Sequence, residues 1–166
     1  MLRNSKFNIY CLVDCLLFPQ RGTVFEFVSK LLLPLLTFVS LPAVSGHEVP
    51  KNIFGAEIIT AEGLLDKVLE HPELVIIDSR HKGDRAQGYI EASINLPDTD
   101  TDCNSLAKII SSYDTPAMFY CNGVKCERSA NAIHKAVACG YKNIYWLRGG
   151  FNEWKAKGFP FLSKLP

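Results

Sequence analysis

Net charge and basic runs are the first things that this sequence lacks. Its 166 residues hold 18 lysines and arginines against 17 aspartates and glutamates, so the formal net charge is +1. Proteins that bind nucleic acid usually gather basic residues on one face, and we therefore expect no nucleic-acid partner. Internal repeats and low-complexity segments are lacking too, and 48% of the residues are hydrophobic. Disordered and fibrous classes are thereby excluded, and one globular domain is expected.

Metal-binding spacing is also missing from the six cysteines. No pair of them has zinc-finger spacing, and no histidine pair follows Cys121 and Cys126. Small disulfide-framework proteins are denser in cysteine than this chain is. We predict no metal site, and we interpret Cys103 and Cys139 as ordinary apolar or surface residues.

No apolar run is long enough for a typical membrane-spanning helix. The run that begins at Leu31 is ~15 residues long and contains prolines, whereas a spanning helix needs about 20 residues. It follows Lys30 and ends in the small residues Ala43 and Ser45, which is the pattern of a secretory signal peptide. We expect cleavage near Ser45 and a periplasmic or secreted protein, with no stable membrane span in the mature form. Retention as a membrane anchor is the alternative.

The remainder of the chain alternates between strand and helix signals. Short apolar runs of the buried-strand type stand at 57–59, 74–77, 93–97, 117–120 and 144–147. Helical spacing of apolar residues follows them at 60–71, 106–110, 129–138 and 151–157. This order predicts an α/β fold in which a parallel sheet carries helices on both faces. We assign 1–46 to an N-terminal extension with the signal peptide, 47–56 to a lead-in, and 57–161 to the folded domain.

The segment that carries chemistry is the turn after the strand at 117–120. Cys121 ends that strand, and a helix begins within a few residues of it. Free backbone N–H groups and the positive end of the helix dipole would then stabilise a thiolate and lower the pKa of Cys121. We predict that Cys121 is the nucleophile, in preference to a buried strand-end cysteine. The loop that would bind an anionic substrate consists of Asn122, Gly123, Val124, Lys125, Cys126 and Arg128.

Two further residues each allow two interpretations. Cys126 could be a resolving thiol that closes a disulfide with Cys121, which requires Cα atoms within about 7 Å, or it could be a packing residue in the first helical turn. Arg80 also follows a predicted strand, at the sheet edge where sites of parallel sheets form. It could clamp a substrate anion, or it could pair with Asp78 or Glu91 and hold loops in place.

Three segments of the chain carry recognisable motifs. V-I-I-D-S-R at 75–80 and G-Y-I-E-A-S-I-N-L-P at 88–97 are similar to the pattern IDxR…GHIxGAxN. The segment 147–160 is similar to the pattern LxGGxxxWxxxGxP. Between them, F-Y-C at 119–121 is followed by a helix. Together these segments resemble the rhodanese-like domain family, whose active-site loop corresponds to F-Y-C and the residues after it. The resemblance covers about residues 57–160.

The resemblance implies a three-layer fold with a central five-stranded parallel sheet, and a sulfurtransferase activity. Cys121 would take the outer sulfur of a thiosulfate-like anion as a persulfide and pass it to a thiophilic acceptor such as a protein thiol. No metal or organic cofactor would be needed. The loop departs from the family at Cys126, where a basic residue is common, and Glu127 excludes phosphatase chemistry because it would repel a phosphate.

Two other functions remain open at this point. The chain could be a thiol–disulfide redox or redox-sensing protein that uses Cys121 together with Cys126. It could also be a non-catalytic module that keeps the fold and uses the loop to bind an anion or a partner.

Overall fold

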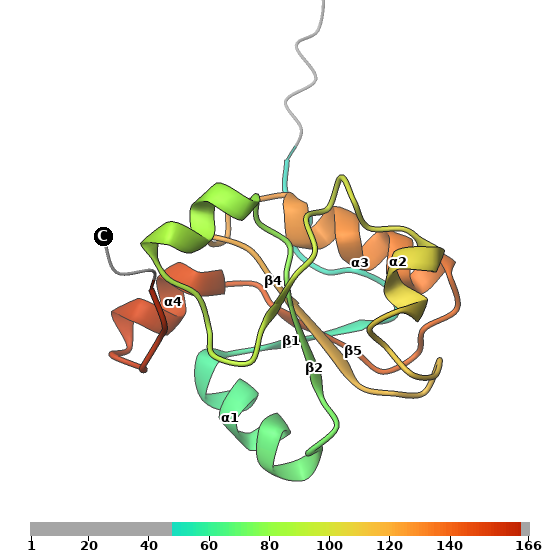
Figure 1. The fold of residues 1–166 in the computed structure, drawn as a ribbon, viewed down its shortest axis with the longest axis horizontal. Coiled ribbons are helices and arrows are strands. Elements are labelled where there is room, and N and C mark those ends of the chain that lie inside the picture. The colour runs from blue at the N-terminus through green and yellow to red at the C-terminus, as the bar shows by residue number, and fades with distance from the viewer. Residues whose placement is uncertain (1–47, 164–166) are drawn as a thin grey trace, which may run out of the picture. The chain divides into compact units, whose positions relative to one another are not determined.

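The computed structural model describes residues 48–163, and the predicted signal peptide at 1–46 lies outside the described residues. Five strands form one sheet in which every neighbouring pair is parallel. They are β1 (Ala56–Ile59), β2 (Val75–Asp78), β3 (Ile94–Asn95), β4 (Ala117–Tyr120) and β5 (Ile144–Leu147), in the order β1-β5-β4-β2-β3. The predicted five-stranded parallel sheet is confirmed (Figure 1).

Helices cover both faces of this sheet, as predicted. On one face lie α2 (Cys103–Ala107) and α3 (Arg128–Ala138), and on the other lie α1 (Ala61–Glu70) and α4 (Gly150–Ala156). Figure 1 shows α1 on the opposite side of the sheet from α2 and α3. A 3-10 helix, η1 (Lys82–Gln87), connects β2 to β3. No helix between residues 48 and 163 has the length and apolar character needed to cross a bilayer.

Capping residues set the helix ends. The Thr60 hydroxyl accepts the N–H of Gly63 at 3.1 Å and starts α1. Asp102 and Ser105 form a capping box at the start of α2. Gly140, with a φ of +97°, follows α3 in the left-handed conformation that glycine adopts most readily, where the sequence predicted a helix end.

The helix marked in the sequence by Leu106, Ile109 and Ile110 begins directly after the Asp-rich turn at 98–102, as expected, because Asp102 caps its N-terminus. It is shorter than expected, however, since α2 ends at Ala107 and Ile109 and Ile110 follow it. Ile110 is nevertheless buried in the core. The apolar spacing therefore reflected burial of these side chains and not a continuing helix.

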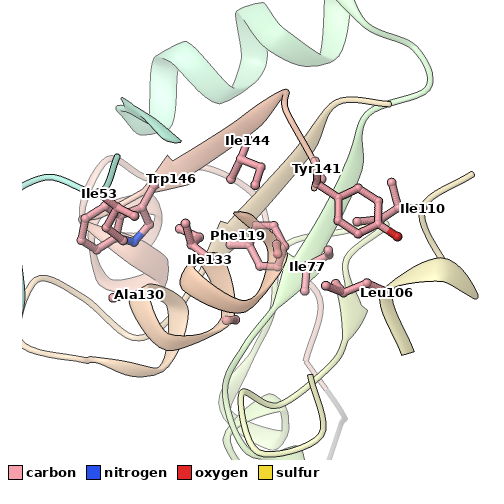
Figure 2. Packing of buried hydrophobic residues seen from close by; sticks show 13 residues of the cluster. Ile53, Ile77, Leu106, Ile110, Phe119, Ala130, Ile133, Tyr141, Ile144 and Trp146 are labelled. Atoms are coloured by element: carbon pink, nitrogen blue, oxygen red, sulfur yellow. The ribbon is translucent and has the colours of Figure 1, made fainter. Parts of the chain in front are cut away.

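Two apolar clusters flank the sheet. Ile77, Phe119 and Trp146 occupy matching positions on β2, β4 and β5 and pack under α2 and α3 (Figure 2). Met118 and Leu64 belong to the cluster on the opposite face, with α1 and α4. All four residues of β4 are fully buried, as expected for a central parallel strand. The strand that delivers Cys121 is therefore anchored on both faces.

A disulfide between Cys103 and Cys139 corrects the sequence interpretation of these residues. It joins the first residue of α2 to the residue after α3, with Cα atoms 5.5 Å apart. The two cysteines are 36 residues apart in the chain, so no local sequence pattern predicts that they pair. The segment between the two cysteines contains β4, Cys121 with the residues after it, and α3, so the disulfide constrains the part of the fold that carries the predicted nucleophile.

Replacing this disulfide should lower stability in a way that depends on redox conditions. For a loop of this length, the chain-entropy estimate of the stabilisation is about 3–4 kcal/mol. We expect the Cys103→Ser/Cys139→Ser double variant to unfold more easily than the wild type by roughly that amount in oxidising urea titrations. With dithiothreitol in both samples the difference should nearly vanish. An equal difference under both conditions would contradict a stabilising disulfide.

Candidate active site

The cysteine loop, defined here as residues 121–127, connects β4 to α3 at the carboxyl edge of the sheet. Cys121 is the first residue beyond the central strand, and only 1% of its surface is exposed. The N–H of Cys126 donates to the Gly123 carbonyl at 2.9 Å, which folds the loop into a turn. α3 begins at Arg128, so Cys126 belongs to the loop and not to the first helical turn.

The turn brings the two loop cysteines together. Cys121 and Cys126 form a disulfide, and their Cα atoms lie 6.2 Å apart. This distance is within the range that a disulfide requires. Cys126 is partly exposed while Cys121 is buried, so the bridge closes the loop over the Cys121 sulfur.

The first turn of α4 forms two backbone hydrogen bonds with the loop. The N–H of Phe151 donates to the Cys121 carbonyl at 2.8 Å, and the N–H of Asn152 donates to the Asn122 carbonyl at 2.8 Å. Gly150 makes this approach feasible, because a Cβ atom there would overlap the Cys121 carbonyl oxygen and the Gly123 nitrogen. Its φ of +61° is a second reason for glycine. The loop thus explains the second glycine of the Gly149–Gly150 pair, whereas a Cβ at Gly149 would meet the Glu153 side chain.

A shallow cavity of about 340 Å³ opens on the loop. Its lining consists of Asn122, Gly123, Val124, Lys125, Cys126 and Asn152. The first five are predicted site residues, and Asn152 was missed. In the described part of the chain, the N–H groups of Val124 and Lys125 enter no backbone hydrogen bond. Donors of this kind are what an anionic sulfur would need.

The positive charge near the loop differs from the sequence prediction. Arg128 lies beside the loop, but its guanidinium pairs with Asp84 of η1 at 3.2 Å. Lys125 is exposed and borders a second cavity of about 320 Å³, which Arg148 and Glu48 also line. Arg148 follows β5 and donates to the Pro50 carbonyl at 3.2 Å. Lys125 and Arg148 thus border this second cavity together with the carboxylate of Glu48, and the sequence did not single out Arg148.

Arg80 takes the second of its two predicted roles. It is 1% exposed, and its Nε and Nη2 donate to the two Asp78 carboxylate oxygens at 2.8 Å each. Nη2 also donates to the Gly88 carbonyl at 2.9 Å, and Nη1 reaches the Asn122 side chain at 3.4 Å. Burial alone would lower the pKa of Arg80, but the hydrogen bonds and charge of Asp78 outweigh it and raise that pKa. We therefore assign Arg80 to positioning the loop and not to clamping a substrate anion.

Tyr120 completes the buried polar layer next to Arg80. Its hydroxyl lies 3.1 Å from the Ser93 hydroxyl and accepts the N–H of Ile90 at 3.3 Å. Burial, helped by the charge of Asp78, raises the pKa of Tyr120 well above its usual range. The phenol stays protonated, and Arg85 also ties this layer to Asp78 at 3.1 Å.

One buried hydroxyl near Cys121 is unsatisfied. Within residues 48–163, Ser79 Oγ is the buried side-chain oxygen that has no hydrogen-bond partner. The Ser79 N–H donates to the Tyr120 carbonyl at 3.0 Å and continues the register in which Ile77 pairs with Phe119. Because alternate residues of a strand share a face, Ser79 and Cys121 follow these strands on the same face of the sheet. An orphan buried hydroxyl is uncommon and calls for an explanation.

No group of three histidine, cysteine, aspartate or glutamate side chains within 48–163 is arranged to hold a metal ion.

Comparisons with known proteins support one family. Residues 60–157 match the rhodanese-like domain family. The uncharacterized protein YibN of Escherichia coli strain K12 is 21% identical over 140 residues, which are 84% of this chain and 96% of YibN. The thiosulfate sulfurtransferase of Pseudomonas aeruginosa superposes with a TM-score of 0.58 at 18% identity, over 66% of this chain and 21% of that one. The polysulfide-sulfur transferase of Wolinella succinogenes gives a TM-score of 0.55 at 22% identity, over 66% and 80%.

Substitution of Gly150 tests the support of the loop by α4. Gly150→Ala places a Cβ against the loop backbone, so we expect a larger loss of stability than Gly158→Ala causes. Gly158 also has a positive φ, +76°, but no atom lies within 4 Å of a Cβ built there. The control should cost about 1–2 kcal/mol for the left-handed backbone, and Gly150→Ala about 1–3 kcal/mol more for overpacking. Equal losses in chemical denaturation would contradict the close contact.

Proposed function

The chain belongs to the rhodanese-like domain family, and on that premise we propose that it is a sulfurtransferase that carries sulfane sulfur as a persulfide on Cys121. The observation that carries this proposal is the position of Cys121. It lies at the end of the central strand, in a loop with free N–H donors and a cavity beside it. That arrangement suits a nucleophile whose charge must be stabilised before and after it reacts.

The proposed reaction has two half-reactions. The Cys121 thiolate attacks the outer sulfur of a donor such as thiosulfate, a new S–S bond forms, and sulfite leaves with the electron pair of the broken bond. A thiophilic acceptor then attacks the outer persulfide sulfur and restores the thiolate. Val124 and Lys125 would donate their backbone N–H groups to the anion. We assign the free Ser79 hydroxyl to the same task once the disulfide is open.

The donor class is a separate part of the proposal. Small sulfur anions fit a site with two exposed or half-exposed cations, Lys125 and Arg148, at its rim. The two solved sulfurtransferases act on thiosulfate and polysulfide by their names, and at this identity their likeness to the chain concerns the fold. Thiosulfate and inorganic polysulfide are therefore the first donors to test, and a protein thiol is the proposed acceptor.

We also propose that the protein works outside the cytoplasm, in the periplasm or the medium. Both cysteine pairs of the folded part are joined as disulfides. Structural disulfides persist mainly in oxidising compartments. The predicted signal peptide provides the route, and cleavage near Ser45 can be checked by sequencing the N-terminus of the mature protein.

A second candidate function is thiol–disulfide exchange or redox sensing by Cys121 with Cys126. The observation that favours it is the disulfide that these two residues form in the loop. In that case the loop would exchange electrons with other thiols and would have no need of a sulfur donor. The two functions differ in whether Cys126 is indispensable.

Steady-state thiocyanate formation from thiosulfate and cyanide separates the two functions. For a sulfurtransferase, Cys121→Ser should lower the rate at least 100-fold, because the nucleophile is lost. Cys126→Ser should retain a measurable rate, since cyanide takes the sulfur directly from Cys121. Retained activity in Cys121→Ser would contradict the proposal.

The Cys103→Ser/Cys139→Ser double variant is the matched control for the loss of cysteines. It removes two thiols outside the cysteine loop and should keep the wild-type rate at a temperature where it is folded. Absence of thiocyanate formation by the reduced wild type, together with dithiol-dependent turnover of the loop disulfide that is lost in both Cys121→Ser and Cys126→Ser, would favour the thiol–disulfide function.

A further inference from the structure

Cys126 occupies a position that neither packing nor charge explains. It precedes α3 and is partly exposed at the mouth of the loop cavity, so it does not serve as a core residue. A thiol there adds no positive charge for an anion. What it does have is a bond to Cys121, the residue proposed to carry the persulfide.

From this geometry we propose that Cys126 resolves the Cys121 persulfide, so that the protein reduces sulfane sulfur to sulfide and ends each cycle with the loop disulfide. The inference rests on the proposed function, because it requires a persulfide on Cys121. It goes further by naming the product, sulfide, and a second partner, a dithiol reductant.

The resolving step balances without any other reactant. The Cys126 thiolate attacks Sγ of Cys121, the inner sulfur of the persulfide, and forms the disulfide bond. The outer sulfur departs as hydrosulfide with the electron pair of the former S–S bond, and it keeps the proton of the persulfide or takes that of Cys126. Two thiols are oxidised to one disulfide, and the sulfane sulfur is reduced by the same two electrons.

The loop geometry favours this attack. The hydrogen bond from Cys126 N–H to Gly123 O holds the turn at 2.9 Å, which keeps the second sulfur close to the first. An intramolecular nucleophile at such a distance has a large advantage over one that must diffuse to the site. The two Cα atoms are 6.2 Å apart, so Cys126 needs no long excursion to reach Sγ of Cys121.

Reduction of the loop disulfide should begin at Cys126 and not at Cys121. Of the two bridged sulfurs, only Cys126 belongs to a partly exposed residue, so an external dithiol attacks there. Cys121 then leaves as a thiolate into the N–H donors of the loop, and a stabilised leaving thiolate speeds disulfide exchange. A mixed disulfide forms on Cys126, and the second thiol of the reductant resolves it. The fully reduced loop is thereby restored.

Single-turnover chemistry without a reductant tests the proposal. Fully reduced protein is freed of reductant and mixed with thiosulfate, and sulfite and sulfide are measured in the same sample. The wild type should release about one sulfide for each sulfite and lose two thiols, as the balanced step requires. Cys126→Ser should release sulfite and retain the extra sulfur, with sulfide appearing after dithiothreitol is added. The Cys103→Ser/Cys139→Ser variant should behave as the wild type does.

The outcomes distinguish a failure of the inference from a failure of the proposed function. Sulfite without sulfide from the wild type, with the extra sulfur stable on the protein, would overturn the resolving role and leave the sulfurtransferase intact. No sulfite from thiosulfate and no persulfide on Cys121 after exposure to polysulfide, in either protein, would remove the proposed function and the resolving step with it.

The reverse reaction gives a test that does not depend on the donor. Oxidised wild-type protein treated with sulfide should gain one sulfur on Cys121 and one free thiol, since a reversible step runs in both directions. Mapping of the trapped peptides should find the persulfide on Cys121. A disulfide that resists sulfide while dithiothreitol opens it would contradict the proposal.

Discussion

Two carbonyl groups of the cysteine loop, those of Cys121 and Asn122, accept hydrogen bonds of 2.8 Å from the first turn of α4. The other features of the site depend on this contact. It is close enough that only glycine fits at position 150, and it turns the loop so that the N–H groups of Val124 and Lys125 stay unpaired. From the neighbouring strand, buried Arg80 reaches the Asn122 side chain and fixes the loop from the other end. The ends of β2, β4 and β5 thus jointly position one sulfur atom.

Much of the fold follows from local patterns. Continuous apolar runs identify the buried strands, and the alternation with helices predicts the parallel sheet. Cys121 and the loop after it could be identified for the same reason, since a strand end next to a helix start is a local feature. Asn152 and Arg148 were missed because they lie in the segment 147–160, far from the loop in sequence. The sequence identified that segment as a family motif, but it did not show that the segment contacts the loop. The pairing of Cys103 with Cys139 depends on how α2 lies against α3, which no local spacing contains.

Charge placement shows the same limit in physical terms. Sequence neighbours suggested that Arg128 would serve the anion site, but its partner Asp84 comes from η1 and offsets its charge. The sequence left Arg80 both a substrate-clamping and a structural interpretation, and its ion pair with Asp78 and its burial favour the structural one. Local sequence shows which charges are near, whereas tertiary structure decides which of them are already paired. The role of Cys126 also depends on tertiary structure, because the turn of the loop brings this second sulfur to the first.

The central claim is that the sulfur atom of Cys121 carries the sulfane sulfur as a persulfide. Its most direct test is peptide mapping of reduced Cys126→Ser protein after exposure to thiosulfate, with persulfides trapped by alkylation before digestion. Because Cys126 is absent from this variant, the Cys121 persulfide should accumulate. The account predicts one extra sulfur on the peptide that contains Cys121 and none on the peptides of Cys103 and Cys139. An extra sulfur on another cysteine, or none on any peptide while sulfite is released, would contradict it.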